Sequence, residues 1–271
     1  MDEIDRYTDC LLNGRPYFGS YMNALSGNPR RHIYMQELVK EVCAANGYRE
    51  IKILEIGSWA GGSAISWAEA IRKYNNSNGT VVCVDPWVPY FDPSTIGIAN
   101  NTVYEEMYRH AKSGDIYKLF IHNISVSGYS NLICPFRGNS DRLLPLFNKG
   151  SFDIVFIDGD HRYGPTIRDL LNTVGLVKNG GCLCGDDLEL QIHQIDIINA
   201  LKFSNKDFIV DPWTQAGFHP GVTLAVGKLI GPVSVYEGFW VVKKELDCWN
   251  HVILSANGNQ IPHHFQFGQG D

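Results

Sequence analysis

Paired carboxylates follow two short apolar runs of the chain. One run ends at Asp158 and Asp160, and the other ends at Asp186 and Asp187. The segment between the runs has the length and the apolar spacing of one amphipathic helix. In a strand–helix–strand unit, the carboxyl ends of both strands lie at the same edge of the sheet, which would bring the four acids together. Carboxylates at such distances repel one another, so we expect a divalent metal ion among them.

A glycine-rich turn, GSWAGGS at residues 57–63, joins a predicted strand to a predicted helix. It has neither the G-x-G-x-x-G of dinucleotide sites nor the G-K-[ST] of a phosphate loop. Glu55, two residues before the first glycine, would repel a phosphate but suits a cationic ligand. Asp85, at the end of the second predicted strand, is placed to hold ribose hydroxyls. These features favour S-adenosylmethionine, which carries a sulfonium, an amino group and a ribose but no phosphate.

Alternating strands and helices must position these residues. We predict strands at 51–57, 80–85, 132–138, 152–157 and 182–185, a hairpin around Glu237 and Gly238, and helices at 32–46, from the glycine-rich turn to 73, and at 103–111, 115–124, 165–174 and from Pro220 onward. A short helix capped by Ser140 or Asp141 follows the third strand. Five strands alternating with helices and then a hairpin indicate a mostly parallel sheet with helices on both faces.

One domain with terminal additions accounts for the chain most simply. We expect an N-terminal arm and helix over residues 1–50, which could serve as a lid or in oligomerisation, the main domain over 51–243, and an irregular tail over 244–271. Residues 188–218 are predicted to be an insertion, in which 188–203 has a helical pattern.

The composition is that of an ordinary globular protein, with 44% hydrophobic residues and a net charge of -6 over 271 residues. No basic cluster indicates nucleic acid as a partner, and no apolar run is long enough to span a membrane. The acidic, polar N-terminus does not resemble a secretory signal. The seven cysteines are scattered without a C-x-x-C pair, which argues against a zinc site or a disulfide framework. We therefore expect a protein of the reducing cytoplasm.

The glycine-rich turn together with IDGDH and GGCLCGDD resembles the class I S-adenosylmethionine-dependent methyltransferases over about residues 32–243. Within them, the motifs are similar to the metal-dependent O-methyltransferases that modify macrolide and aminocoumarin sugars, and more distantly to the cephalosporin-biosynthesis and catechol enzymes. The resemblance implies a Rossmann-like, mostly parallel seven-stranded sheet with a C-terminal antiparallel hairpin. It also implies an enzyme with a small-molecule acceptor, and relatives of this kind commonly form homo-oligomers.

The resemblance assigns roles to individual residues. Asp158, Asp186 and Asp187 match the metal-ligand positions, and Asp158 also lies beside the cofactor. Asp160 and His161 match the place where some relatives keep a catalytic base, although sugar-modifying relatives usually have an aromatic residue or leucine where this chain has His161. The positions that match cofactor-binding residues are Glu55, Gly57, Ser58, Gly61 and Ser63 for the methionine moiety, Asp85 for the ribose, and Asn139, Ser140 and Asp141 for the adenine.

Methyl transfer from a sulfonium to oxygen needs an activated hydroxyl aligned with the methyl group. Oxygen-only ligands favour Mg²⁺ for this purpose, and Mn²⁺ or Ca²⁺ would also suit them. The acceptor is expected to be a hydroxyl of a sugar or of a sugar-containing natural product. A catechol-like phenol is the alternative: a roomy, polar site would favour the sugar and a narrow, aromatic one the phenol. A non-catalytic cofactor-binding protein and a metal-dependent hydrolase are two further alternatives.

Overall fold

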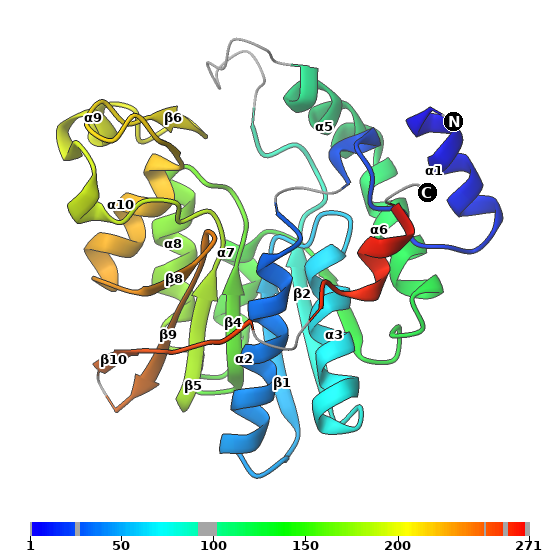
Figure 1. The fold of residues 1–271 in the computed structure, drawn as a ribbon, viewed down its shortest axis with the longest axis horizontal. Helices are drawn as coiled ribbons and strands as arrows, with labels where there is room; N and C mark the ends of the chain where they lie inside the picture. Colours follow the sequence, from blue (N-terminus) through cyan, green and yellow to red (C-terminus); the bar gives the residue numbers. More distant parts are fainter. Residues whose placement is uncertain (1, 25–27, 92–101, 247, 257–259, 269–271) are drawn as a thin grey trace.

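A mixed eight-stranded sheet forms the centre of the protein (Figure 1). In this computed structural model, residues 2–24, 28–91, 102–246, 248–256 and 260–268 are described. The strand order is β10-β9-β5-β4-β1-β2-β3, and β8 also pairs with β9. The strands are β1 Ile51–Ile56, β2 Gly79–Asp85, β3 Ile133–Arg137, β4 Phe152–Ile157, β5 Val177–Gly185, β8 Ser234–Tyr236, β9 Phe239–Glu245 and β10 Cys248–His251.

The first five strands are parallel, and β9 is antiparallel to β5. The chain order reverses at β1, which pairs with β2 on one side and β4 on the other, so a crevice forms at the carboxyl ends of these strands. Glu237 and Gly238 join β8 to β9 with φ angles of 54° and 94°. Two positive φ angles are typical of the type I′ turns that close hairpins. The predicted mostly parallel sheet with a C-terminal hairpin is therefore confirmed.

The tail contains one strand that we did not predict. Instead of being irregular from residue 246, the chain forms β10, which pairs antiparallel with the second half of β9, whereas β8 pairs with the first half. On β9, Val241 pairs with Ser234 of β8, and the next residue, Val242, pairs with His251 of β10. The four residues of β10 are too few to show an alternating pattern. The unpaired outer edge of β9 determines the pairing, and the sequence alone does not reveal that edge.

Helices cover both faces of the sheet. In Figure 1, α2 and α3 lie side by side over one face, and α8 and α10 pack together on the other. Successive strand residues alternate between the two cores, so that Ile53 packs with α2 and α3, and Leu54 packs with α8 and α10. The helices are α1 Glu3–Leu12, α2 Arg31–Ala45, α3 Gly62–Asn75, α5 Thr102–Ser113, α6 Asp115–Val126, α7 Ser140–Leu143, α8 Tyr163–Thr173, α9 Ile197–Lys202 and α10 Pro220–Leu229, with 3₁₀ turns η1 Tyr21–Asn23, η2 Leu144–Leu146, η3 Ile192–Gln194 and η4 His263–Gly268.

The insertion contains less helix than its pattern predicted. Only η3 and α9 form within 188–203, and a two-stranded hairpin follows, made of β6 Ile209–Val210 and β7 Gly217–Phe218. The Asp196 carboxylate accepts the backbone N–H groups of Ile198 and Asn199, so the helix begins there and not earlier. A similar cap corrects the start of α7, because the side chain of Asn139 accepts the N–H of Asp141. None of the helices described in the structure is long and apolar enough to span a membrane.

Candidate functional site

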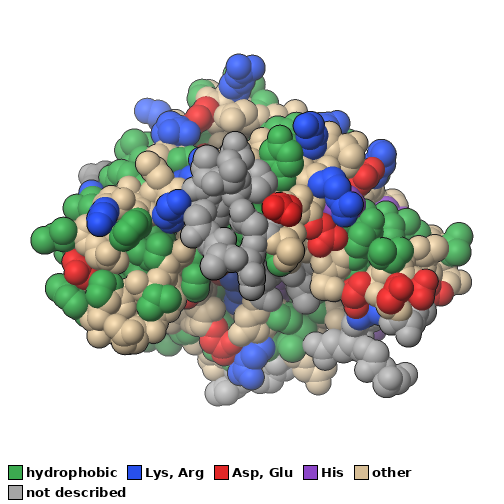
Figure 2. Space-filling model, turned by 90° about the horizontal axis from the view of Figure 1, so that it is seen from above, with side chains coloured by type: hydrophobic (Ala, Val, Ile, Leu, Met, Phe, Trp, Pro, Cys, Tyr) green, Lys and Arg blue, Asp and Glu red, His purple; other side chains and the backbone are tan. Residues whose placement is uncertain are grey.

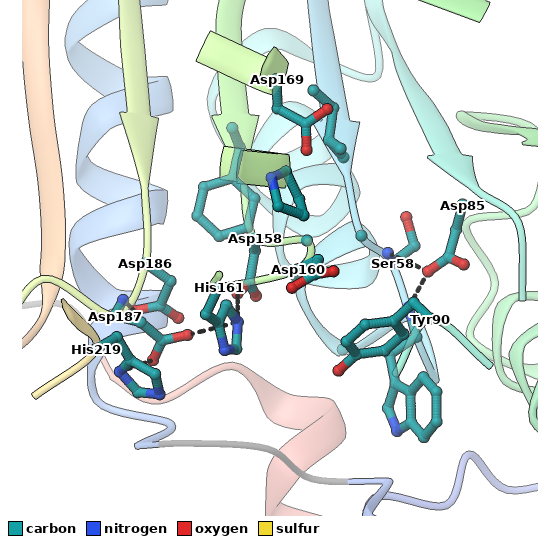
Figure 3. A pocket seen from close by; sticks show the side chains of 18 of the residues that line it. Ser58, Asp85, Tyr90, Asp158, Asp160, His161, Asp169, Asp186, Asp187 and His219 are labelled. Atoms are coloured by element: carbon teal, nitrogen blue, oxygen red, sulfur yellow. Dashed lines mark hydrogen bonds and ion pairs between the residues drawn. The ribbon is translucent and has the colours of Figure 1, made fainter. Parts of the chain in front are cut away.

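A cavity of about 910 Å³ opens at the carboxyl ends of the central strands. Figure 2 looks onto this side of the protein, where acidic and basic side chains are mixed on the described surface. The cavity is lined by most of the predicted site residues, and Figure 3 shows how several of them face one another. These are Gly57, Ser58, Ser63, Asp85, Asn139, Ser140, Asp141, Asp158, Asp160, His161, Asp186 and Asp187.

Glu55 does not line the cavity and lies beneath it. It follows Ile51 and Ile53 on the face of β1 that packs against α2 and α3, where it is fully buried near the first residues of α3. Neither carboxylate oxygen has a hydrogen-bond partner. Burial raises the pKa of Glu55 to about 8, although the nearby hydroxyls of Ser58 and Ser63 lower it in part. A cationic ligand near this buried acid would favour its ionised form and so offset the effect of burial on its pKa.

This burial predicts how stability depends on pH. The pKa of Glu55 is higher in the folded state than its ordinary value of 4.5, so the stability of the ligand-free protein should fall as pH rises from about 4.5 to 8. Glu55→Gln removes the titration. The unfolding free energy of the variant, relative to the wild type, should therefore rise by about 2–4 kcal/mol between pH 5 and pH 8.5. Urea unfolding at both pH values measures this, and a difference that does not change with pH would contradict it.

The glycine-rich turn is held tightly against its neighbours. Gly57 has a φ of +82°, and a Cβ there would lie 2.0 Å from the carbonyl oxygen of Asp158. Gly61 also lies outside the cavity lining, and a Cβ on it would meet the ring of Phe120 at 3.0 Å. The turn thus needs glycine at 57 for the close approach of β1 and β4, and at 61 for packing against α6.

Asp85 ties the turn to the end of β2. Its Oδ2 accepts the backbone N–H groups of Ser58 at 2.9 Å and Trp59 at 3.0 Å, and its Oδ1 accepts that of Trp87 at 2.6 Å. Burial raises the pKa of Asp85, and the three N–H groups oppose this rise. Asp85 therefore shapes the turn through its carboxylate as well as lining the cavity.

The metal-ligand candidates meet at the ends of β4 and β5. Asp158, Asp187 and His161 each offer a ligand atom within 4.8 Å of the others. Asp186 lies beside them and forms an ion pair with Arg31, which also approaches Asp187 at 3.4 Å. Burial raises the pKa of Asp186 well above its usual range, with Asp187 and Asp158 adding to the effect against Arg31. Asp158, Asp186 and Asp187 thus bring three carboxyl groups together beside the single guanidinium of Arg31.

His161 bridges the carboxylates of two separate segments. Its Nε2 lies 3.0 Å from Asp187, and its Nδ1 lies 3.0 Å from Asp207 in the insertion. Burial would lower the pKa of His161, but Asp187 and Asp207 hold it well above its ordinary value. Burial would raise the pKa of Asp207, but the neighbouring His161 outweighs this effect, and the pKa falls to about 2. The hydroxyl of Tyr104 donates a further hydrogen bond to Asp207.

Asp160 has a different partner from its neighbour. Its carboxylate accepts hydrogen bonds from Arg162, with Nε 2.9 Å from Oδ1 and 3.1 Å from Oδ2. Arg162 also donates to the carbonyl oxygen of Tyr90. This guanidinium occupies both oxygens of Asp160, and carboxylates likewise contact both ring nitrogens of His161. Of the two base candidates, only His161 directs a ring nitrogen at the metal-ligand candidates Asp158 and Asp187.

Three residues of the site carry no signal in the sequence. Arg31 begins α2, Asp207 lies in the insertion, and His219 precedes α10; all three line the cavity. The Nδ1 atom of His219 lies 3.0 Å from Glu189 and 3.9 Å from Asp187. For His219, the sequence offers one indirect signal: Pro220 marks the first turn of α10, which makes His219 the residue just before that helix.

Comparisons with known proteins concern the domain and the fold. A family model described as a methyltransferase domain matches residues 54–188, from β1 to the acidic pair after β5. No curated protein matches the chain by sequence. Among solved structures, the O-methyltransferase NovP is 17% identical over 80% of each chain with a TM-score of 0.53. The calicheamicin methyltransferase CalS11 is 13% identical over 88% of this chain and 90% of its own, with a TM-score of 0.51. Likeness at these identities confirms the predicted Rossmann-like fold.

Proposed function

We propose that the chain is a metal-dependent O-methyltransferase acting on a sugar hydroxyl, with the methyltransferase domain matched over residues 54–188 carried on the Rossmann-like fold. The observation that carries this proposal is one cavity shared by the glycine-rich turn after β1 and by the acids after β4 and β5. A methyl donor on the turn would then face an acceptor oxygen near the acids, as in-line transfer requires.

The residues around the turn fit S-adenosylmethionine. The buried, unpaired carboxylate of Glu55 beneath the turn favours a ligand with positive charge above it. We assign the methionine moiety to Gly57, Ser58 and Ser63, with Gly61 shaping the turn. Asp85 would hold the ribose through Oδ1, which accepts one N–H and keeps a second lone pair, whereas Oδ2 already accepts two.

The acids fit a hard divalent cation such as Mg²⁺. We assign Asp158, Asp186 and Asp187 as its ligands, because these carboxyl groups, of which Asp186 is buried and the other two are partly buried, lie together at the ends of β4 and β5. When bound, the metal would act as a Lewis acid that lowers the pKa of an acceptor hydroxyl. Arg31, which is itself buried, would hold Asp186 and Asp187 in place through its ion pairs with them.

His161 is assigned as the base that takes the proton of the acceptor hydroxyl; a bound metal would offset the charge of Asp187, which together with Asp207 holds the pKa of the imidazole well above its ordinary value in the metal-free protein. The Asp207 carboxylate holds its Nδ1, which leaves Nε2 directed toward Asp158 and Asp187 (Figure 3). Tyr104 in turn holds Asp207, so α5 and the insertion both position the imidazole. Asp160, paired with Arg162, would position the loop after β4.

The character of the cavity favours a sugar as the acceptor. Its volume of about 910 Å³ exceeds the needs of the cofactor alone and leaves room for a second ligand. Polar side chains of the insertion and its flanks, Glu189, Asp207 and His219, line the end near the metal-ligand candidates. Such groups can bind several hydroxyls, whereas a catechol-like phenol would be better served by a narrow aromatic slot.

A thermal-shift matrix tests the proposed function. S-adenosylhomocysteine at a hundredfold excess over its Kd should stabilise the protein by about 2.7 kcal/mol and raise Tm by several degrees. Mg²⁺ should add a second shift that EDTA reverses. Indifference to S-adenosylhomocysteine would remove the methyltransferase activity from consideration. Binding of S-adenosylhomocysteine without any response to Mg²⁺ or EDTA would leave a metal-independent enzyme or a non-catalytic binding protein.

A further inference from the structure

Asp169, on α8, is a buried acid of the cavity that none of the roles above uses. It is 5% exposed and lines the cavity beside Ser140, whose hydroxyl lowers its pKa. Burial outweighs this effect and raises the pKa of Asp169 to about 6. No ion pair joins Asp169 to a basic side chain among the described residues. A buried acceptor in this position is costly unless a donor reaches it.

Asp169 lies away from the acids assigned to the metal. Figure 3 shows its carboxylate on the far side of Asp158 and Asp160 from Asp186, Asp187 and His219. A Cβ on Gly159 would lie 3.4 Å from its Oδ2, so the missing side chain at residue 159 leaves the carboxylate open toward the cavity. A ligand can therefore approach Asp169 over the backbone of Gly159.

Three apolar side chains line the cavity near Asp169. Ile56 and Val84 are partners in adjacent strands, and both pack on the α8 side of the sheet. Pro165 lies one helical turn before Asp169, so the two share a face of α8. All three line the cavity. A flat, largely apolar ring with one exocyclic donor matches apolar side chains that lie beside a buried carboxylate.

Asp141, the acid expected to contact the adenine, has other partners. Asp141 forms an ion pair with Arg168 at 3.1 Å and accepts from Asn172 at 3.5 Å. It is also more exposed than Asp169, with 39% of its side chain accessible. The segment Asn139–Asp141 therefore brings Ser140 to this part of the cavity, while the buried acceptor comes from α8.

We propose that Asp169 accepts a hydrogen bond from the exocyclic amino group of the cofactor adenine and so selects adenosyl over inosyl ligands. This inference rests on the proposed function, because it assumes that the cavity binds an adenosyl cofactor. It assigns the selectivity for adenine to a residue outside the turn after β3. The methionine and the ribose would remain with the glycine-rich turn and Asp85.

Isothermal titration with S-adenosylhomocysteine and S-inosylhomocysteine tests the inference. Inosine has an oxo group in place of the amino group, so it presents an acceptor to the Asp169 carboxylate. The wild type should bind the adenosyl ligand about tenfold or more tightly, as expected for one hydrogen bond to a charged acceptor. Asp169→Ala should lose this preference, and Asp169→Asn should relax it, because an amide can donate to the oxo group.

Asp141→Asn is the matched comparison and should keep the preference. Loss of the preference in Asp141→Asn, with retention in both Asp169 variants, would overturn the inference in favour of Asp141. Equal binding of the two ligands by the wild type would overturn it as well, while leaving the proposed function intact. If the wild type bound neither ligand, the proposed function would fail together with this inference. Thermal melts of each variant, compared with the wild type, separate lost selectivity from lost folding.

Discussion

Asp158→Ala should abolish Mg²⁺ binding and lower kcat about a thousandfold. Asp158 lies where β4 ends, within 4.8 Å of the ligand atoms of both Asp187 and His161, so its loss opens the centre of the proposed site. Lewis-acid stabilisation is worth several kcal/mol, and each 1.36 kcal/mol corresponds to about a factor of ten in rate. Titration calorimetry with Mg²⁺, alongside a methyl-transfer assay, measures both effects.

The neighbouring acid provides the control for this variant. Asp160→Asn should keep Mg²⁺ binding, because its carboxylate is held by Arg162 and, among the described residues, is not grouped with the ligand atoms of Asp158, His161 and Asp187. S-adenosylhomocysteine binding, measured separately, shows whether the cofactor site survives in Asp158→Ala. Mg²⁺ binding that persisted in Asp158→Ala would mean that the metal site lies elsewhere.

His161→Ala should lower kcat by about 10²–10⁴-fold, the usual contribution of a general base. The Nε2 atom of His161 lies 3.7 Å from Asp158 and 3.0 Å from Asp187, which places the imidazole beside the acceptor oxygen proposed for this site. S-adenosylhomocysteine should bind the variant as it binds the wild type, because His161 has no assigned contact with the cofactor. Single-turnover methyl transfer, compared with equilibrium binding, separates the two quantities.

Asp160→Asn discriminates between the two base candidates. The pairing with Arg162 predicts a loss of less than about tenfold, typical of a positioning residue and smaller than the loss of a base. A larger loss in Asp160→Asn than in His161→Ala would reverse the assignment. Activity surviving in the double variant would eliminate both residues as the base.

The acceptor site combines parts that are distant in the sequence. Asp207 and His219 belong to the insertion and its end, Tyr104 to α5, and Arg31 to α2. Insertions and terminal additions of this kind commonly adapt a shared catalytic framework to one substrate. The sugar specificity that we propose would therefore depend on these segments, and the transfer chemistry on the framework between β1 and β5.

The sequence alone determined the framework, because its signals are local. Apolar runs that stop at acids mark strand ends, and parallel strands place their carboxyl ends at one edge of the sheet. That argument predicted that Asp158, Asp160, Asp186 and Asp187 would share a site, and all four line one cavity. The glycine-rich turn was predictable for the same reason, since the close approach at Gly57 depends on that residue type.

The tertiary structure decided which partner each of these residues has. Asp160 and His161 are adjacent in the sequence, yet Arg162 holds one and Asp207 holds the other. Glu55 looked like a cavity residue, but the alternation of β1 turns it beneath the first turn of α3. In the sequence, Asp169 is one polar position of an amphipathic helix; only the packing of α8 on the sheet shows that it lines the cavity. Contacts of this kind join distant segments: a sequence separation of 46 lies between His161 and Asp207, and one of 156 between Arg31 and Asp187. Local periodicity carries no information over such separations, because it reports which face of an element is buried and not which element covers it.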